Sequence, residues 1–169
     1  MNKRRSWVLS TGWLLALVAI GVVGLKFGLG GALAGAALQT GPLKTQVVSW
    51  DQAQLREADW GQMRFYFRGE TAQTTAALVA VATVLPGKAV HRAHRHAEEE
   101  YLILVTGEGT WQIGDRQFPA KRGDILYAEP WVYHGLVNTG SEPLIFVVVR
   151  YQGKGVPVPP RPDDRPDEL

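Results

Sequence analysis

The chain has 169 residues, of which 46% are hydrophobic and 20% are charged, and its formal net charge is +2 at neutral pH. This length suits about one domain, and the absence of cysteine excludes disulfides, thiolate metal ligands and a cysteine nucleophile. The first 44 residues hold five of the 18 bases and no acid, so the remainder, with 13 bases and 16 acids, has a net charge of −3. This mildly acidic remainder gives no indication of nucleic-acid binding.

The N-terminal segment has the pattern of a membrane-spanning or signal helix. Bases at positions 3–5 precede an uncharged, mostly apolar run over residues 7–25. About 20 apolar residues span a bilayer core, and the preceding bases predict a cytoplasmic N-terminus and an extracytoplasmic remainder. We expect residues 1–44 to be an uncleaved anchor with a Gly/Ala-rich tether, because the apolar run is longer than a signal-peptide core. The alternative is a cleaved signal peptide, with small residues at positions 32–34, and a secreted product.

Residues 45–152 have the sequence pattern of an all-β domain. Short apolar runs alternate with Gly, Pro, Asp and Asn, which favours many short strands in an antiparallel sandwich or barrel. Residues 52–59 are compatible with either a helical turn or a loop. The expected strands are Val47–Trp50, Met63–Phe67, Ala76–Leu85, Tyr101–Thr106, Gly109–Ile113, Arg116–Ala120, Asp124–Ala128, His134–Asn138 and Leu144–Tyr151.

The C-terminal residues 153–169 differ from the domain in composition. Five of the ten prolines of the chain fall at positions 157–166, and acids dominate the end. This composition predicts an extended, disordered tail.

A dense cluster of ligand-type residues lies in the middle of the chain. The histidines His91, His94 and His96 are followed by glutamates at positions 98–100. On a strand, residues two apart share a face, so His94 and His96 point the same way, as do Glu98 and Glu100, whereas His91 has the other parity. Imidazole and carboxylate together suit one divalent transition metal, Mn²⁺, Fe²⁺, Ni²⁺ or Zn²⁺.

Two spaced motifs resemble those of a small single-domain cupin. The likeness covers residues 50–151. The gap between Gly87 and His94 is one residue longer than in the usual first motif, and Val132 stands where the second motif has a glycine. The first motif comprises Gly87, His94-Arg95-His96, Glu100 and Gly107, and the second comprises Gly123, Pro130, His134 and Asn138.

This resemblance implies a double-stranded β-helix, the jelly-roll or cupin barrel, with a metal inside it. Glu98 is then a substitute ligand or a nearby general base, His91 a residue at the pocket rim, and Glu99 faces outward. The implied ligands are His94, His96, Glu100 and His134.

Several other residues have simpler expected roles. Asn138 closes a turn. Arg92 and Arg95 are expected to be solvated; the alternative is that an arginine at the mouth of the barrel holds a carboxylate substrate.

The fold that the resemblance implies does not fix the function. We expect an exported metalloenzyme acting on a small oxygen-containing molecule, oxygenase-type first and isomerase or hydrolase next, with Glu98 or His91 moving protons. The alternative is a non-catalytic module, tethered to the membrane, that binds or senses a small ligand. Edge strands of such barrels often pair, so a homodimer is a further expectation.

Overall fold

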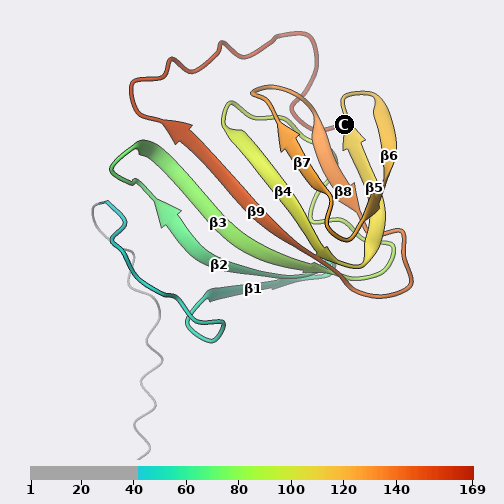
Figure 1. Cartoon of the computed structure of the whole chain (residues 1–169). Helices are drawn as coiled ribbons and strands as arrows, with labels where there is room; N and C mark the ends of the chain where they lie inside the picture. Colours follow the sequence, from blue (N-terminus) through green and yellow to red (C-terminus); the bar gives the residue numbers. More distant parts are fainter. Residues whose placement is uncertain (1–41) are drawn as a thin grey trace, which may run out of the picture. The chain divides into compact units, whose positions relative to one another are not determined.

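The computed structural model describes residues 42–169 (Figure 1). The predicted membrane or signal helix and most of its tether lie outside these residues. Within residues 42–169, no helix has the length and apolar character needed to cross a membrane.

Two antiparallel sheets make up the described part of the chain. The larger has the strand order β1-β2-β3-β9-β4-β7 and the smaller the order β6-β5-β8. This all-β arrangement agrees with the double-stranded β-helix implied by the sequence. The strands are β1 (Gln54–Ala58), β2 (Gly61–Gly69), β3 (Thr74–Val84), β4 (Glu99–Thr106), β5 (Glu108–Ile113), β6 (Arg116–Lys121), β7 (Ile125–Ala128), β8 (His134–Val137) and β9 (Leu144–Gly153).

The first predicted strand is wrong. Residues 47–50 form no strand, and the first strand is β1, inside the segment for which the sequence favoured a helical turn or a loop. All five residues of β1 are exposed, and the strand exists because it pairs with β2, from Ala58 opposite Gly61 to Gln54 opposite Phe65. A strand held by backbone pairing at a sheet edge carries no alternating apolar pattern for the sequence to reveal.

The core lies on the inner faces of the two sheets. Alternation is clear in β4, where Glu100, Leu102 and Leu104 are buried and the residues between them are less so. At the turn after β4, Gly107 has a φ of 85°, and a Cβ there would lie 2.8 Å from the Cα of Leu144. The buried apolar side chains are Ala80, Ala82, Val84, Leu102, Leu104, Trp111, Ala120, Leu126, Ala128, Leu136, Leu144, Phe146 and Val148.

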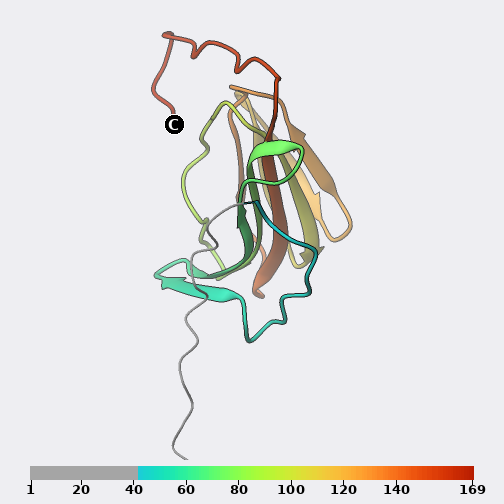
Figure 2. The same ribbon diagram turned by 90° about the vertical axis from the view of Figure 1, so that its left-hand side faces the viewer.

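The C-terminal tail, residues 154–169, lies against the barrel. It leaves β9, arches over the ends of β4 and β7 (Figure 1) and finishes beside the loop that precedes β4 (Figure 2). There the backbone N–H of Arg95 donates to the carbonyl of Asp167, and that of Leu169 donates to the carbonyl of Ala93, each at 2.9 Å. The tail therefore has hydrogen-bond partners on the barrel, and the disorder that its composition predicts stays a prediction.

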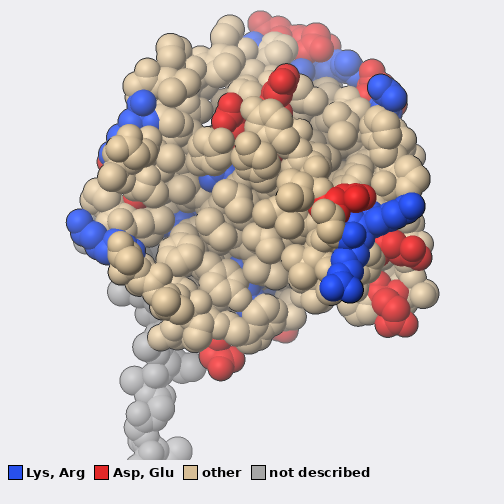
Figure 3. Space-filling view, in the orientation of Figure 1, with Lys and Arg blue, Asp and Glu red and all other residues tan. Residues whose placement is uncertain are grey.

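Charged side chains do not gather on the face drawn in Figure 3. Basic and acidic groups are interspersed there, and most of the surface carries neither. This face therefore has no basic stripe of the kind that tracks a phosphate backbone.

Candidate metal centre

Backbone pairing brings the histidines together from two distant segments. His94 lies in the loop between β3 and β4, and His134 begins β8. The N–H of each donates to the carbonyl of the other, at 3.0 and 2.9 Å. This pair of hydrogen bonds fixes two candidate ligands side by side although 39 residues separate them.

Three imidazoles converge at this point. The ring centroids of His94 and His96 are 5.1 Å apart, those of His94 and His134 are 4.7 Å apart, and those of His96 and His134 are 4.9 Å apart. Each ring offers one nitrogen, and these three atoms lie within 4.8 Å of one another. Three histidines could therefore hold a metal ion.

The hydrogen bonds of the rings suit metal binding. The Nδ1 of His96 lies 2.9 Å from the carbonyl of Glu98, and the Nδ1 of His134 lies 2.9 Å from that of Val132. A carbonyl only accepts, so each Nδ1 carries the hydrogen and each Nε2 keeps a lone pair. Both Nε2 atoms, and the Nδ1 of His94, are buried without a hydrogen-bond partner. Unpaired buried polar atoms are costly, and a metal ion would satisfy all three.

Glu100 lies beside the three rings on the inner face of β4. Its carboxylate oxygens are 3.4 Å from Nε2 of His96 and 3.2 Å from Nε2 of His134, and only 4% of the residue is exposed. Burial raises the pKa of this carboxyl, but the imidazoles of His134 and His96 outweigh burial and hold the pKa well below its usual range. The carboxylate is thus ionised and turned toward the nitrogens that lack partners.

His94 is a neutral imidazole at physiological pH. Burial and, after it, the neighbouring rings of His91, His134 and His96 together lower its pKa to about 3, although Glu100 acts to raise it. A neutral ring is the form that binds a metal.

Glu98 and His91 occupy different sides of the cluster. The carboxylate of Glu98 is 3.4 Å from Nδ1 of His96, the nitrogen that already donates to a carbonyl. This placement suits orientation of the ring. His91 packs edge-on against His94, with ring centroids 3.9 Å apart, and its Nδ1 donates to the carbonyl of Arg92 at 2.8 Å.

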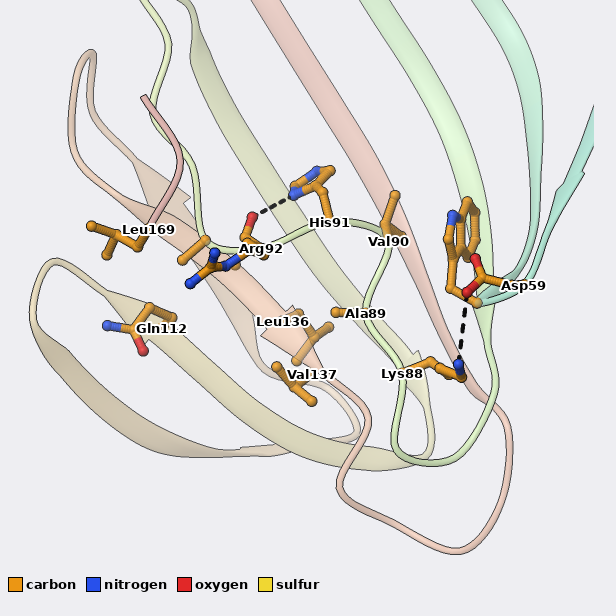
Figure 4. A pocket seen from close by; sticks show the side chains of 13 residues that line it. Asp59, Lys88, Ala89, Val90, His91, Arg92, Gln112, Leu136, Val137 and Leu169 are labelled. Carbon is orange, nitrogen blue, oxygen red and sulfur yellow. Dashed lines mark hydrogen bonds and ion pairs between the residues drawn. The ribbon is translucent and has the colours of Figure 1, made fainter. Parts of the chain in front are cut away.

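His91 also separates two spaces. On one side is a pocket of about 570 Å³ between the loop and β8, whose wall includes Lys88, Arg92 and Val137 (Figure 4). On the other is a cavity of about 30 Å³ that reaches His134. His91 is therefore a rim residue, as the sequence suggests, and it touches both the open pocket and the interior.

The prediction that Arg95 is solvated is wrong. Only 4% of Arg95 is exposed, because the C-terminal tail wraps its guanidinium. Nη1 donates to Asp164 at 2.8 Å, Nε to Asp167 at 3.4 Å, and Nη2 to the carbonyls of Pro162 and Arg165. The acidic residues of the tail are visible in the sequence, but they lie about 70 positions from Arg95, so no local pattern indicates that they pair with it.

Trp131 is a second residue whose role the sequence missed. Its φ is 63°, in the left-handed region that is uncommon outside glycine. The backbone N–H donates to the carbonyl of His96 at 2.7 Å, and the indole N–H donates to the carbonyl of Pro159 at 2.8 Å. Trp131 therefore links the ligand segment to the tail.

Asn138 closes the turn after β8, as expected. Its Nδ2 donates to the carbonyls of Val84 and Glu142 at 2.9 and 2.8 Å, and its Oδ1 accepts from the N–H of Gly140. Glu99 accepts a hydrogen bond from the hydroxyl of Tyr127 on the outer face.

Comparison with known proteins agrees with the all-β fold. Residues 80–150 match the family model described as the cupin domain. The matched segment is thus similar to a cupin domain over 71 of the 169 residues. A solved protein of Klebsiella pneumoniae with a double-stranded β-helix domain is 25% identical, with a TM-score of 0.53 over 67% of this chain and 95% of that one.

Two curated proteins that this chain resembles have different names. The oxalate-binding protein of Thermotoga maritima is 27% identical over 88 residues, which are 52% of this chain and 73% of that protein. A gentisate 1,2-dioxygenase of a Streptomyces species is 31% identical over 74 residues, which are 43% of this chain. The match spans only 21% of the length of the dioxygenase.

Proposed function

We propose that this domain holds one divalent transition metal and acts on a small oxygen-bearing molecule, with an oxygenase-type reaction as first choice. The observation that carries the proposal is the set of three buried ring nitrogens that converge without hydrogen-bond partners. The neighbouring carboxylate makes the donor set one of nitrogen and oxygen, which suits Mn²⁺, Fe²⁺, Ni²⁺ or Zn²⁺. The proposed ligands are His94, His96, His134 and Glu100.

The bound metal would supply Lewis-acid or redox chemistry to the oxygen-bearing molecule. His91 is the residue placed to exchange protons. Its Nδ1–H donates to the carbonyl of Arg92, which leaves Nε2 for proton exchange, and the ring lines both the open pocket and the cavity. Glu98, beside Nδ1 of His96, keeps that ring in the tautomer that leaves Nε2 available.

A non-catalytic binding module is the second candidate. The cavity inside His91 is only about 30 Å³, close to the volume of one water molecule, and its other walls include the apolar Met63, Leu102 and Phe146. The match covers 73% of one curated relative, and that relative is named an oxalate-binding protein. The name of this relative is the observation that favours capture of a small ligand without turnover.

The metal proposal is tested by elemental analysis of protein purified without added metal. We expect stoichiometric metal in the native protein and background levels in His94→Ala/His134→Ala. The matched control is His91→Ala, which removes a neighbouring imidazole and should leave the metal content unchanged. Equal metal content in the double variant and the native protein contradicts the proposal.

Turnover separates the two candidates. Oxygen uptake is measured with Fe²⁺-, Mn²⁺- and Ni²⁺-loaded protein against a panel of small oxygenated molecules. An oxygenase consumes oxygen with at least one of them, and His91→Ala reduces the rate by roughly 10²–10⁴-fold, the usual contribution of a proton-transfer residue. Saturable binding without uptake supports the binding module.

We further propose that residues 1–44 anchor the domain on the extracytoplasmic side of a membrane. The uncharged run at residues 7–25 and the bases before it support this topology. A reporter that is active only outside the cytoplasm, fused after Leu169, should be active and should sediment with membranes. Activity in the culture medium indicates the cleaved form, and a cytoplasmic reporter contradicts the topology.

A further inference from the structure

The outer pocket has the size of a small-molecule binding site. Its volume is about 570 Å³, within the range of about 300–1,000 Å³ that is usual for such sites. The cavity that reaches His134 is about 30 Å³ and has room for about one water molecule. An organic molecule that binds without rearranging these walls therefore fits the outer pocket and not the inner cavity.

Backbone pairing separates this pocket from the candidate metal centre. The loop before β4 is joined to β8 at two points, where Ala89 pairs with Val137 and His94 pairs with His134. Between these points the loop lies close against Gly135, where a Cβ would stand 3.1 Å from the nearest backbone atom of the loop. The three candidate histidine ligands do not line the outer pocket, so this pocket is a space of its own.

The middle of the pocket is apolar. Ala89, Leu136 and Val137 lie between its two ends, and the side chain of Leu169 lies at one end (Figure 4). Val137 is 39% exposed there, although its side chain is a hydrocarbon. A hydrocarbon chain laid along these residues would remove apolar surface from water on both sides of the contact, which is favourable.

The two ends of the pocket differ in charge. At one end the ammonium of Lys88 lies 3.7 Å from the carboxylate of Asp59, so these charges balance each other (Figure 4). At the other end Arg92 is exposed, and within residues 42–169 its guanidinium makes no ion pair. The amide of Gln112 is already hydrogen-bonded to a backbone carbonyl and to a neighbouring glutamine. A ligand group at this end therefore meets a positive charge, which favours an anion.

We propose that the outer pocket binds a small amphiphilic anion, a carboxylate with an apolar chain of medium length. The chain lies along Leu136 and Val137, and the carboxylate meets the guanidinium of Arg92. This site goes beyond the proposed function, because it needs no metal. Its occupant also touches His91, whose ring lines the pocket and packs on His94 with ring centroids 3.9 Å apart. The bound anion is thus one side chain away from the candidate metal centre.

The test is calorimetric titration of the full chain, metal-free and loaded with Mn²⁺, with hexanoate, octanoate and octanamide. We expect octanoate to bind about tenfold more tightly than hexanoate, because two more CH₂ groups become buried. Octanoate should bind about three- to fivefold more tightly than the uncharged octanamide, as suits an exposed ion pair. The metal-free and the loaded protein should give the same affinities.

Two variants separate the apolar middle from the charged end. Val137→Trp fills the pocket and should abolish octanoate binding, whereas Ile125→Trp, at an exposed position of β7 outside the pocket, should bind as the native protein does. Arg92→Met should bind octanoate and octanamide equally. Its matched control is Arg122→Met, at another exposed arginine, which should keep the native preference. Denaturant unfolding shows whether each variant is folded.

The outcomes distinguish this site from the metal centre. Unchanged octanoate affinity in folded Val137→Trp overturns the site, as do equal affinities for hexanoate and octanoate or native protein that binds neither. An unchanged preference in Arg92→Met overturns the assignment of the charged end. Loss of octanoate binding in metal-free protein or in His94→Ala/His134→Ala places the ligand at the metal centre and overturns the separate site. Octanoate binding by native protein that contains no metal supports the site and refutes the metal proposal alone.

Discussion

The segment that carries His94 and His96 has β8 on one side and the C-terminal tail on the other. β8 bonds it through the His94–His134 pair, and the tail bonds it through the N–H groups of Arg95 and Leu169. β8 is anchored by buried side chains, whereas the tail is anchored by polar contacts to one buried guanidinium. One side of the site therefore depends on the hydrophobic core, and the other side depends on a few charge-assisted hydrogen bonds.

The largest effect is expected on the β8 side. Leu136→Ala removes a buried core side chain and should lower the free energy of unfolding by about 2–5 kcal/mol. Denaturant unfolding measures this change. The neighbouring Val137, which is 39% exposed on the same strand, is the control. Val137→Ala should alter stability by less than about 0.5 kcal/mol, and equal losses in the two variants would contradict the assignment of β8 to the core.

A smaller loss is expected at the end of β8. Asn138→Ala leaves the buried carbonyl of Val84 without its side-chain donor and should cost roughly 1–3 kcal/mol. The same unfolding assay measures it. Thr139→Ala, on the exposed next residue, should be nearly neutral. A neutral Asn138→Ala would mean that the turn does not need its hydrogen bonds.

On the tail side, Arg95→Met should free the tail while the barrel stays folded. The stem of the side chain remains, but the donors to Asp164 and Asp167 are lost. We expect protease cleavage within residues 154–169 and a metal affinity reduced by at most about tenfold, the low end for residues that position ligands. Arg161→Met, which removes a more exposed partner of Asp167, is the control. Resistance of the Arg95→Met tail to cleavage would refute the anchor.

The smallest effect is expected from pH. The hydrogen bond from Arg95 holds the pKa of Asp164 below its usual range. A group whose pKa is lower in the docked state stabilises docking above its free pKa, and that contribution is lost as the pH falls through the lowered value. Acid should therefore loosen the tail, as followed by the fluorescence of Trp131 or by hydrogen exchange. Arg95→Met should lack this transition; its persistence would assign it to another group.

The strands that could be predicted are those with one buried face. In β4 the alternation of buried and less buried positions marks the strand and places Glu100 inward. β1 could not be predicted, because all its side chains are exposed and only its pairing with β2 defines it. The contacts of the C-terminal tail could not be predicted for the same kind of reason, because they join polar groups of the tail to Arg95, Trp131 and Ala93, which lie far from the tail in the sequence.

The sequence by itself determined the alternation of short apolar runs with turn residues, the all-β class and the residue types of the candidate metal centre. Alternation is a local property, so it places Glu100 on the inner face of β4 with Leu102 and Leu104, whereas His94 and His96 lie in the loop before that strand. Only the tertiary structure decided which distant residues meet that face. The register that aligns Arg150 with Glu100 and the contacts that bury Arg95 join residues 50 or more positions apart. Such pairings depend on the closure of the barrel, which no local pattern encodes.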